Sequence, residues 1–191
     1  MTASRREKKL RLLSLLALPL LLAVAFAVNA RRNVDDYVHQ IETSVRPITT
    51  GQTYAGAEWQ VEKVRLIGDG RDTKTVLPGQ MRLLIVQLKA IAREQVGEGW
   101  SQCRFTLVDD QGRRWLPLDP MLSRDISRDL DRKATPVDGC GTASLHPPAK
   151  DGSVTIEEKF VVPAEVLPSL KARLSFVASR PEANALPLKF E

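Results

Sequence analysis

The chain has 191 residues and a formal net charge of +5, from 28 Lys and Arg and 23 Asp and Glu. Its two cysteines exclude a disulfide-dense miniprotein and a four-cysteine zinc site. Residues 1–32 hold seven cations and one anion, whereas residues 33–191 hold 21 cations and 22 anions. The basic charge therefore belongs to the N-terminal segment, and the remainder gives no electrostatic case for binding nucleic acid.

The N-terminal segment has the pattern of a membrane anchor. Residues 12–28 contain no charged residue, and residues 12–30 are just long enough to cross a hydrocarbon core of about 30 Å as a helix. Because Lys and Arg are enriched on the inner side of membranes, the basic flank at residues 1–11 predicts a cytoplasmic N-terminus. The chain is therefore expected to cross the cell (inner) membrane once, with its remainder in a periplasm or at the cell surface.

A cleaved signal peptide is the alternative to a retained anchor. It requires a basic start and a small-residue cleavage motif, which residues 25–27 or 28–30 would supply. The apolar run is longer than the core of a usual signal peptide. Arg31 and Arg32 directly follow it and oppose translocation. Both features favour the anchor.

The periodicity of the chain changes after the anchor. Residues 33–45 place apolar side chains at helical spacing, which predicts a juxtamembrane helical stalk over residues 31–47, ended by Pro47. Short apolar runs and period-two segments follow, separated by Gly and Pro turns. The expected strands are 59–66 with a bulge-like phase slip, 81–92 as a buried central strand, 101–110, 113–118, 153–163, 170–178 and an edge strand at 187–190. Residues 48–191 are therefore expected to form an all-β antiparallel β-sandwich.

An insertion at residues 119–152 interrupts this strand pattern. Its residues 123–133 place Asp and Arg three or four positions apart, which predicts an exposed helix or loop with weak ion pairs. The functional alternative is a surface that docks a partner, together with the turn at residues 97–100. The candidate partner surface consists of Trp100, Arg124, Asp125, Arg128, Asp129 and Arg132.

The two cysteines lie in different parts of the predicted domain. Cys103 falls in an expected strand and Cys140 in the insertion. In an oxidising compartment we expect them to form a disulfide that holds the insertion to the sheet, with a stabilisation of roughly 3–4 kcal/mol. Two unpaired thiols are the alternative, because spacing does not prove pairing. The sequence has no Cys-x-x-Cys motif of a redox-active pair.

No residue pattern indicates catalysis, a metal site or a cofactor. His39 and His146 lie in different segments, and neither has a second ligand at metal-binding spacing. The sequence lacks Gly-x-Ser-x-Gly, Walker, dinucleotide-binding and EF-hand patterns. We therefore expect no enzyme, no cofactor and no nucleotide. An envelope hydrolase that uses His146 with carboxylates of the insertion is the alternative.

Four segments together resemble a family of bacterial extracytoplasmic immunoglobulin-like domains of unknown function, which is similar to secreted mycobacterial immunogenic proteins. They are GQTYAGAEWQVEKVRL, VLPGQMRLLIVQLKA, CRFTLVDDQGRRWLPL and KFVVPAEV, within residues 48–178. The resemblance implies an immunoglobulin-like sandwich behind a signal or anchor, and no catalytic residue. The chain departs from lipoprotein members by lacking a lipobox cysteine, and from the shortest members by its insertion.

Together these patterns predict a membrane-anchored extracytoplasmic module that binds another envelope protein without catalysis. The alternatives are the hydrolase described above and a structural spacer domain.

Overall fold

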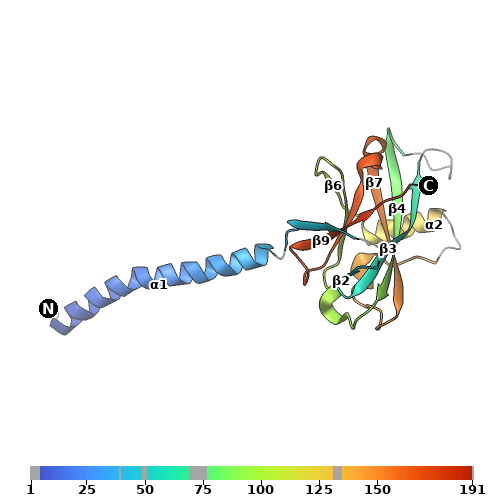
Figure 1. The fold of residues 1–191 in the computed structure, drawn as a ribbon. Helices are drawn as coiled ribbons and strands as arrows, with labels where there is room; N and C mark the ends of the chain where they lie inside the picture. Colours follow the sequence, from blue (N-terminus) through green and yellow to red (C-terminus); the bar gives the residue numbers. More distant parts are fainter. Residues whose placement is uncertain (1–4, 39, 49–50, 69–76, 131–134, 191) are drawn as a thin grey trace. The chain divides into compact units, whose positions relative to one another are not determined.

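The computed structural model describes residues 5–38, 40–48, 51–68, 77–130 and 135–190. The chain divides into two compact units, Met1–Ile41 and Glu42–Glu191. The first contains one helix, α1 (Arg5–Val38), drawn in blue in Figure 1. Its stretch Leu13–Val38 is long and apolar enough to cross a membrane, and its most apolar part is not buried. A signal sequence has the same properties, so this helix is an anchor or a signal sequence.

The helix ends before the predicted stalk does. Residues 31–38 continue α1, as expected, but Ser44–Pro47 form strand β1. This strand pairs in parallel with β9 (Glu182–Pro187), so its backbone groups bond to the sandwich. The prediction of a helical stalk up to residue 47 is therefore wrong for Ser44–Pro47, because pairing within a sheet outweighs the local helical spacing.

Two sheets form a β-sandwich in the second unit (Figure 1). One sheet has four strands in the order β2-β3-β4-β7, and the other has five in the order β1-β9-β8-β5-β6. The remaining elements are β2 (Thr53–Tyr54), β3 (Ala57–Ile67), β4 (Met81–Ala92), η1 (Gly97–Trp100), β5 (Arg104–Val108), β6 (Arg114–Trp115), α2 (Pro120–Leu130), α3 (Cys140–Ala143), β7 (Ser153–Pro163), η2 (Ala164–Ser169) and β8 (Lys171–Ser175). An all-β fold is therefore too strict a description, because helices accompany the sandwich.

Strand β4 confirms the central apolar strand predicted for residues 81–92, at both of its ends. It lies between β3 and β7. Leu84, Val86 and Leu88 pack in the main core, whereas Leu83 and Ile85 pack in a second cluster on the opposite face. Because both faces of the strand are covered, its sequence is apolar throughout instead of alternating. The predicted phase slip in β3 is also confirmed, as a β-bulge between Val61 and Lys63.

The last strand departs from its prediction. An edge strand is expected at residues 187–190, but β9 ends at Pro187 and lies inside the sheet, between β1 and β8. Ala183 and Leu186 of β9 are buried. The strand begins Glu-Ala-Asn-Ala, which has few of the β-branched and aromatic residues that favour strands. Its position between two partners, and not its local propensity, explains this strand.

Trp100 lies in the core, so its prediction as a partner-contact residue is wrong. Its side chain is fully buried. The centroid of its ring lies 4.8 Å from that of Trp59 and 5.9 Å from that of Phe176. Its Nε1 donates a 2.9 Å hydrogen bond to the carbonyl oxygen of Ala55. With its ring packed and its polar atom bonded, the short helix Gly97–Trp100 directs this side chain inward.

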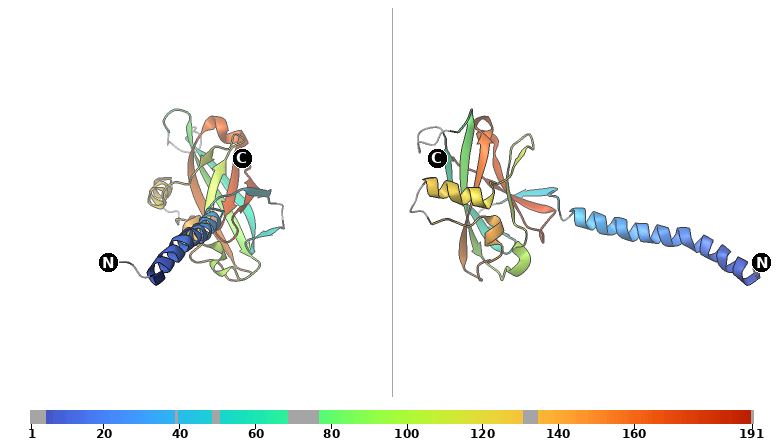
Figure 2. Two further views of the ribbon diagram at one scale, coloured as in Figure 1. Left: turned by 90° about the vertical axis from the view of Figure 1, so that its left-hand side faces the viewer. Right: turned by 180° about the vertical axis from the view of Figure 1, so that it is seen from behind.

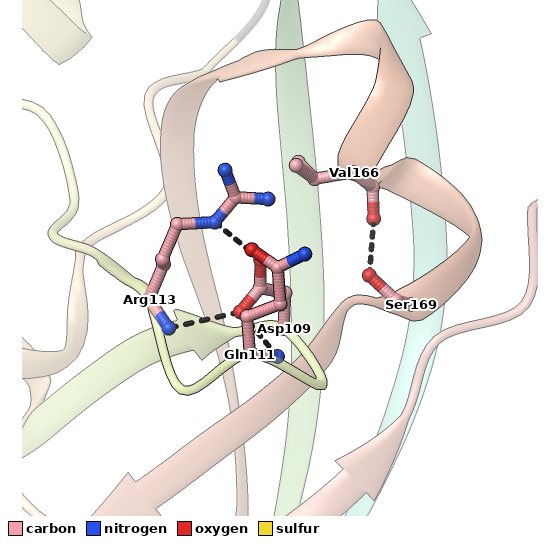
Figure 3. Close-up of polar contacts among 5 residues, drawn as sticks. All are labelled: Asp109, Gln111, Arg113, Val166 and Ser169. Atoms are coloured by element: carbon pink, nitrogen blue, oxygen red, sulfur yellow. Dashed lines mark hydrogen bonds and ion pairs between the residues drawn. The ribbon is translucent and has the colours of Figure 1, made fainter.

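One carboxylate fixes the hairpin between β5 and β6 (Figure 3). Asp109 Oδ1 accepts hydrogen bonds from the backbone N–H groups of Gln111 and Arg113, at 3.0 and 2.8 Å. Its Oδ2 accepts a 2.7 Å bond from Arg113 Nε. Burial acts to raise the pKa of Asp109, but these bonds and the charge of Arg113 hold it below its ordinary value. Asp109 and Arg113 therefore have a structural role in this turn.

Candidate binding pocket at the insertion

The insertion is attached along the edge of the four-stranded sheet. The N–H of Leu118 donates to the carbonyl oxygen of Lys159 at 2.8 Å, and the N–H of Glu157 donates to that of Asp138 at 3.0 Å. Both bonds involve β7, which is the last strand of its sheet. The chain thus leaves and returns along the same strand edge, whose backbone groups would otherwise be open to pairing.

Helix α2 covers the outer face of the four-stranded sheet, as the views in Figure 2 show. Its Ile126 and Leu130 pack against the second apolar cluster, which contains Leu83 and Ile85. Met121 and Leu122, in its first turn, are exposed. The helix therefore covers the sheet and presents apolar side chains to solvent at the same time.

A buried ion pair lies beneath α2. Lys159 is only 2% exposed. Its Nζ lies 2.5 Å from Glu157 Oε1 and donates to Ser123 Oγ at 3.0 Å, while Gln87 Nε2 donates to the other oxygen of Glu157 at 2.7 Å. Buried charges are stable only when they are paired and hydrogen-bonded. Lys159 therefore joins Glu157 of β7 to Ser123 of α2 and supports the position of the helix.

The predicted disulfide between Cys103 and Cys140 is present, with Cα atoms 5.5 Å apart. It joins the residue before β5 to the first residue of α3. The N–H of Cys140 donates a 2.6 Å hydrogen bond to Glu158 Oε1. A Cβ atom at Gly139 would lie 2.9 Å from that oxygen, so this position has no room for a side chain. The disulfide and the carboxylate together hold α3 against β5 and β7.

Glu158 of β7, which accepts the hydrogen bond from Cys140, has a perturbed pKa. Burial raises its pKa to about 7, against the opposing effects of the Cys140 N–H bond and the charge of Lys159. The residue is 8% exposed. A carboxyl group with this pKa changes its charge near neutral pH. Such perturbed carboxyl groups are unusual in proteins as a whole but are frequent at functional sites.

These elements surround an open pocket of about 450 Å³, here called the insertion pocket. Its lining comes from β5, α2, α3 and β7 and includes the disulfide and Glu158. Leu116 and Leu145 also line it, and they are 69% and 73% exposed. Apolar side chains gathered around a concave surface are typical of sites that contact a ligand or a protein. The insertion pocket is therefore the candidate site.

The structure brings only part of the predicted partner surface to this pocket. Arg124 is exposed and lines the pocket, and Asp125 is exposed on α2. Arg128 and Asp129 lie in α2, but their side chains and the whole of Arg132 fall outside the described residues. Trp100 belongs to the core.

His146 follows α3 and is exposed. In the part of the chain that the structure describes, no hydrogen bond joins its imidazole to a nucleophile or an acid. Within the same residues no group of three or more His, Cys, Asp or Glu side chains could hold a metal ion. His39 lies outside the described residues. The geometry therefore offers no observation in favour of the hydrolase alternative.

Sequence analysis did not single out Leu116, Leu145 or Glu158, which all line the insertion pocket. One signal was available, because Glu157-Glu158-Lys159 places three charges in a predicted strand, where at least one must point inward. No comparable signal exists for the two leucines. Single exposed apolar residues are common, and only the fold brings these two to one pocket.

A second groove, of about 340 Å³, runs along β3 and β9. Its lining includes Trp59 and the lysines Lys63, Lys89 and Lys189. Lysines and a β-bulge are usual protections of a strand edge against pairing with another chain. We therefore assign this groove no binding role.

The comparisons with known proteins show a similarity of fold alone. No family model and no curated protein matches the chain. A conserved hypothetical protein from Bacillus anthracis is similar in structure, with a TM-score of 0.43 and 8% identity over 74% of this chain and 94% of its own. An uncharacterized β-sandwich protein from Clostridium difficile 630 has a TM-score of 0.39 and 7% identity over 76% and 96%. The chain is thus similar to uncharacterized bacterial β-sandwich proteins, and no function is drawn from them.

Proposed function

We propose that the chain is a single-pass membrane protein whose immunoglobulin-like sandwich binds another protein of the cell envelope. In this proposal residues 1–11 lie in the cytoplasm, residues 12–30 cross the inner membrane, and the sandwich lies in the periplasm or at the cell surface. The exposed apolar helix α1 supports the anchor. The disulfide is consistent with an oxidising extracytoplasmic compartment.

The exposed rim of the insertion pocket carries the binding proposal. Leu116 precedes the insertion and Leu145 lies near its far end, yet both line one pocket. Each remains largely exposed. Burying one leucine side chain on a partner contributes about 1.5–3 kcal/mol, so these two alone would dominate a modest interface.

Substitution of the rim tests this proposal. Full-length protein with Leu116→Glu and Leu145→Glu, solubilised from envelopes in mild detergent, should lose a partner that wild type retains in a pull-down. The expected loss of affinity is at least about tenfold, because the apolar contact of both side chains is removed. Phe190→Glu is the matched control, because Phe190 is also an exposed large apolar residue and does not line the pocket.

The control variant should retain the partner. Identical sets of proteins recovered with wild type, the rim variant and the control would contradict the binding proposal. That result would agree with the spacer alternative, which requires no specific partner.

A further inference from the structure

One carboxyl group of the insertion pocket lies on the inner face of its sheet. Ile156 and Phe160 of β7 pack in the main core, and side chains alternate along a strand, so Glu158 lies on the same face. Glu157 and Lys159 lie on the other face, beneath α2. Glu158 lines the insertion pocket although it is only 8% exposed. Its carboxyl group therefore belongs to the buried wall of the pocket and not to its rim.

Hydrogen bonding satisfies only part of this carboxyl group. Its Oε1 accepts the 2.6 Å bond from the N–H of Cys140. Its Oε2 accepts no hydrogen bond from the residues that the structure describes. Lys159 is next to it in the chain, but the Nζ of Lys159 is paired with Glu157 on the other face. Glu158 thus lacks the counter-ion that a buried carboxylate needs in order to be stable.

The other charged side chains of the lining are in different situations. They are Arg104, Asp119, Arg124, Asp138 and Glu157. Glu157 is paired with Lys159, and Arg104 lies on the outer face of β5, because the next residue, Phe105, points into the main core. The remaining three are exposed, so water solvates their charges. Within the described part of the lining, Glu158 is therefore the buried carboxyl group that a cation from outside would complete.

The shape of the pocket decides which cation fits. Leu116 and Leu145 at the rim are apolar and largely exposed, whereas Glu158 lies in the wall. A lysine side chain has the matching order, an apolar four-carbon stem that ends in a compact ammonium group. The guanidinium group of arginine is best matched by two free carboxylate oxygens, and Oε1 of Glu158 is already bonded to Cys140. The pocket therefore fits lysine better than arginine.

We propose that the insertion pocket receives a lysine side chain of the partner protein. Its stem lies against Leu116 and Leu145, and its ammonium group is paired with Glu158. This inference rests on the proposed function, which supplies the partner, and it adds the chemistry of the contact.

Small-molecule probes test the ammonium contact on the full-length chain in mild detergent. The probes are Nα-acetyl-lysine methylamide and its norleucine analogue, which has the same four-carbon stem without the ammonium group. By saturation-transfer NMR at about pH 8, the lysine probe should bind about tenfold more tightly, because it adds a charged hydrogen bond. Equal binding of the two probes, or binding of neither, would overturn the proposal.

Substitution of the carboxyl group assigns the effect to Glu158. Glu158→Gln should reduce binding of the lysine probe to the level of the norleucine probe. Glu165→Gln is the matched control, because Glu165 is exposed and does not line the pocket. Glutamine retains an acceptor for the Cys140 N–H, and the unfolding transition of the variant checks that it folds. Lysine-probe binding that is unchanged in a folded Glu158→Gln variant would contradict the proposal.

The pH dependence of wild type provides a test that needs no variant. Burial raises the pKa of Glu158 to about 7, so lowering the pH from about 8 to about 6 protonates most of this carboxyl group. An ammonium group then has to displace the proton, and the affinity for the lysine probe should decrease about tenfold. A ligand that covers Glu158 with apolar atoms favours the protonated form instead. An affinity that rises as the pH falls would therefore overturn the lysine assignment.

The pull-down from envelopes separates this proposal from the proposed function. The partner that wild type retains should be recovered by Glu165→Gln and lost, by about tenfold or more, with Glu158→Gln, because a desolvated charge pair is broken. Equal recovery by wild type and Glu158→Gln would contradict the lysine contact alone. Recovery of no specific partner by wild type would contradict the proposed function.

Discussion

Buried charges in the second unit are compensated in different ways. Asp109 accepts three hydrogen bonds, two of them from backbone N–H groups in its own hairpin. Lys159 is paired with Glu157 beneath α2. Glu158 accepts a bond from the Cys140 N–H, and burial raises its pKa to about 7. Glu158 is therefore the group in the insertion pocket whose charge changes near neutral pH.

Glu158 should give the stability a distinct pH dependence. Its pKa is higher in the folded chain than its ordinary value of 4.5, so the folded chain binds this proton more tightly. The resulting stabilisation is complete below about pH 4.5, decreases as the pH rises to about 7, and is absent above that pH, a total change of about 3 kcal/mol. Glu158→Gln should remove this dependence, as measured by chemical denaturation across the pH range.

The readout is the difference in unfolding free energy between wild type and variant at each pH. This difference cancels other titrating groups, such as Asp109, which act in the opposite direction. Glu165→Gln is the matched control, because Glu165 is exposed. A difference that does not vary with pH for Glu158→Gln would show that this carboxyl is not perturbed in the folded chain.

At the scale of elements, the bounds of a strand could be predicted where the local sequence favours a strand and the sheet contains one at the same residues. β4 and β7 match their predicted bounds because each is long, apolar and bounded by turn residues. β1 and β9 were missed, because both depend on pairing with neighbouring strands and neither has a strong strand composition. The inward position of Trp100 was also missed, since a turn sequence does not show which way an aromatic side chain points.

The disulfide should be the main support of the insertion. Replacing both Cys103 and Cys140 with Ser should lower the free energy of unfolding by roughly 3–4 kcal/mol, since the bridge closes a loop of 37 residues in the unfolded chain. α3 should lose protection from hydrogen exchange before β4 does, because its four residues depend on the bridge and on Glu158.

Thiol counting provides the matching chemical measurement. Protein taken from the envelope should show no free thiol after alkylation under denaturing conditions. Two labelled thiols, or a serine variant as stable as wild type, would contradict this role for the bridge.

At the scale of the whole molecule, the chain's positive charge is concentrated at its N-terminal end. The N-terminal 32 residues carry an excess of six positive charges and the remainder is nearly neutral, which sequence alone established. The insertion pocket was only partly accessible to prediction. The insertion, its disulfide and Arg124 could be predicted, whereas the pocket itself depends on where β5, β7 and both ends of the insertion meet in space.

The most direct test of the central claim is photocrosslinking from the insertion pocket in intact cells. A photoreactive amino acid is placed at Leu145, on the pocket rim, and in a second strain at Phe190, outside the pocket. The proposed function predicts one discrete adduct of defined mass from position 145, and no adduct of that mass from position 190. The same adducts from both positions, or none from position 145, would contradict it.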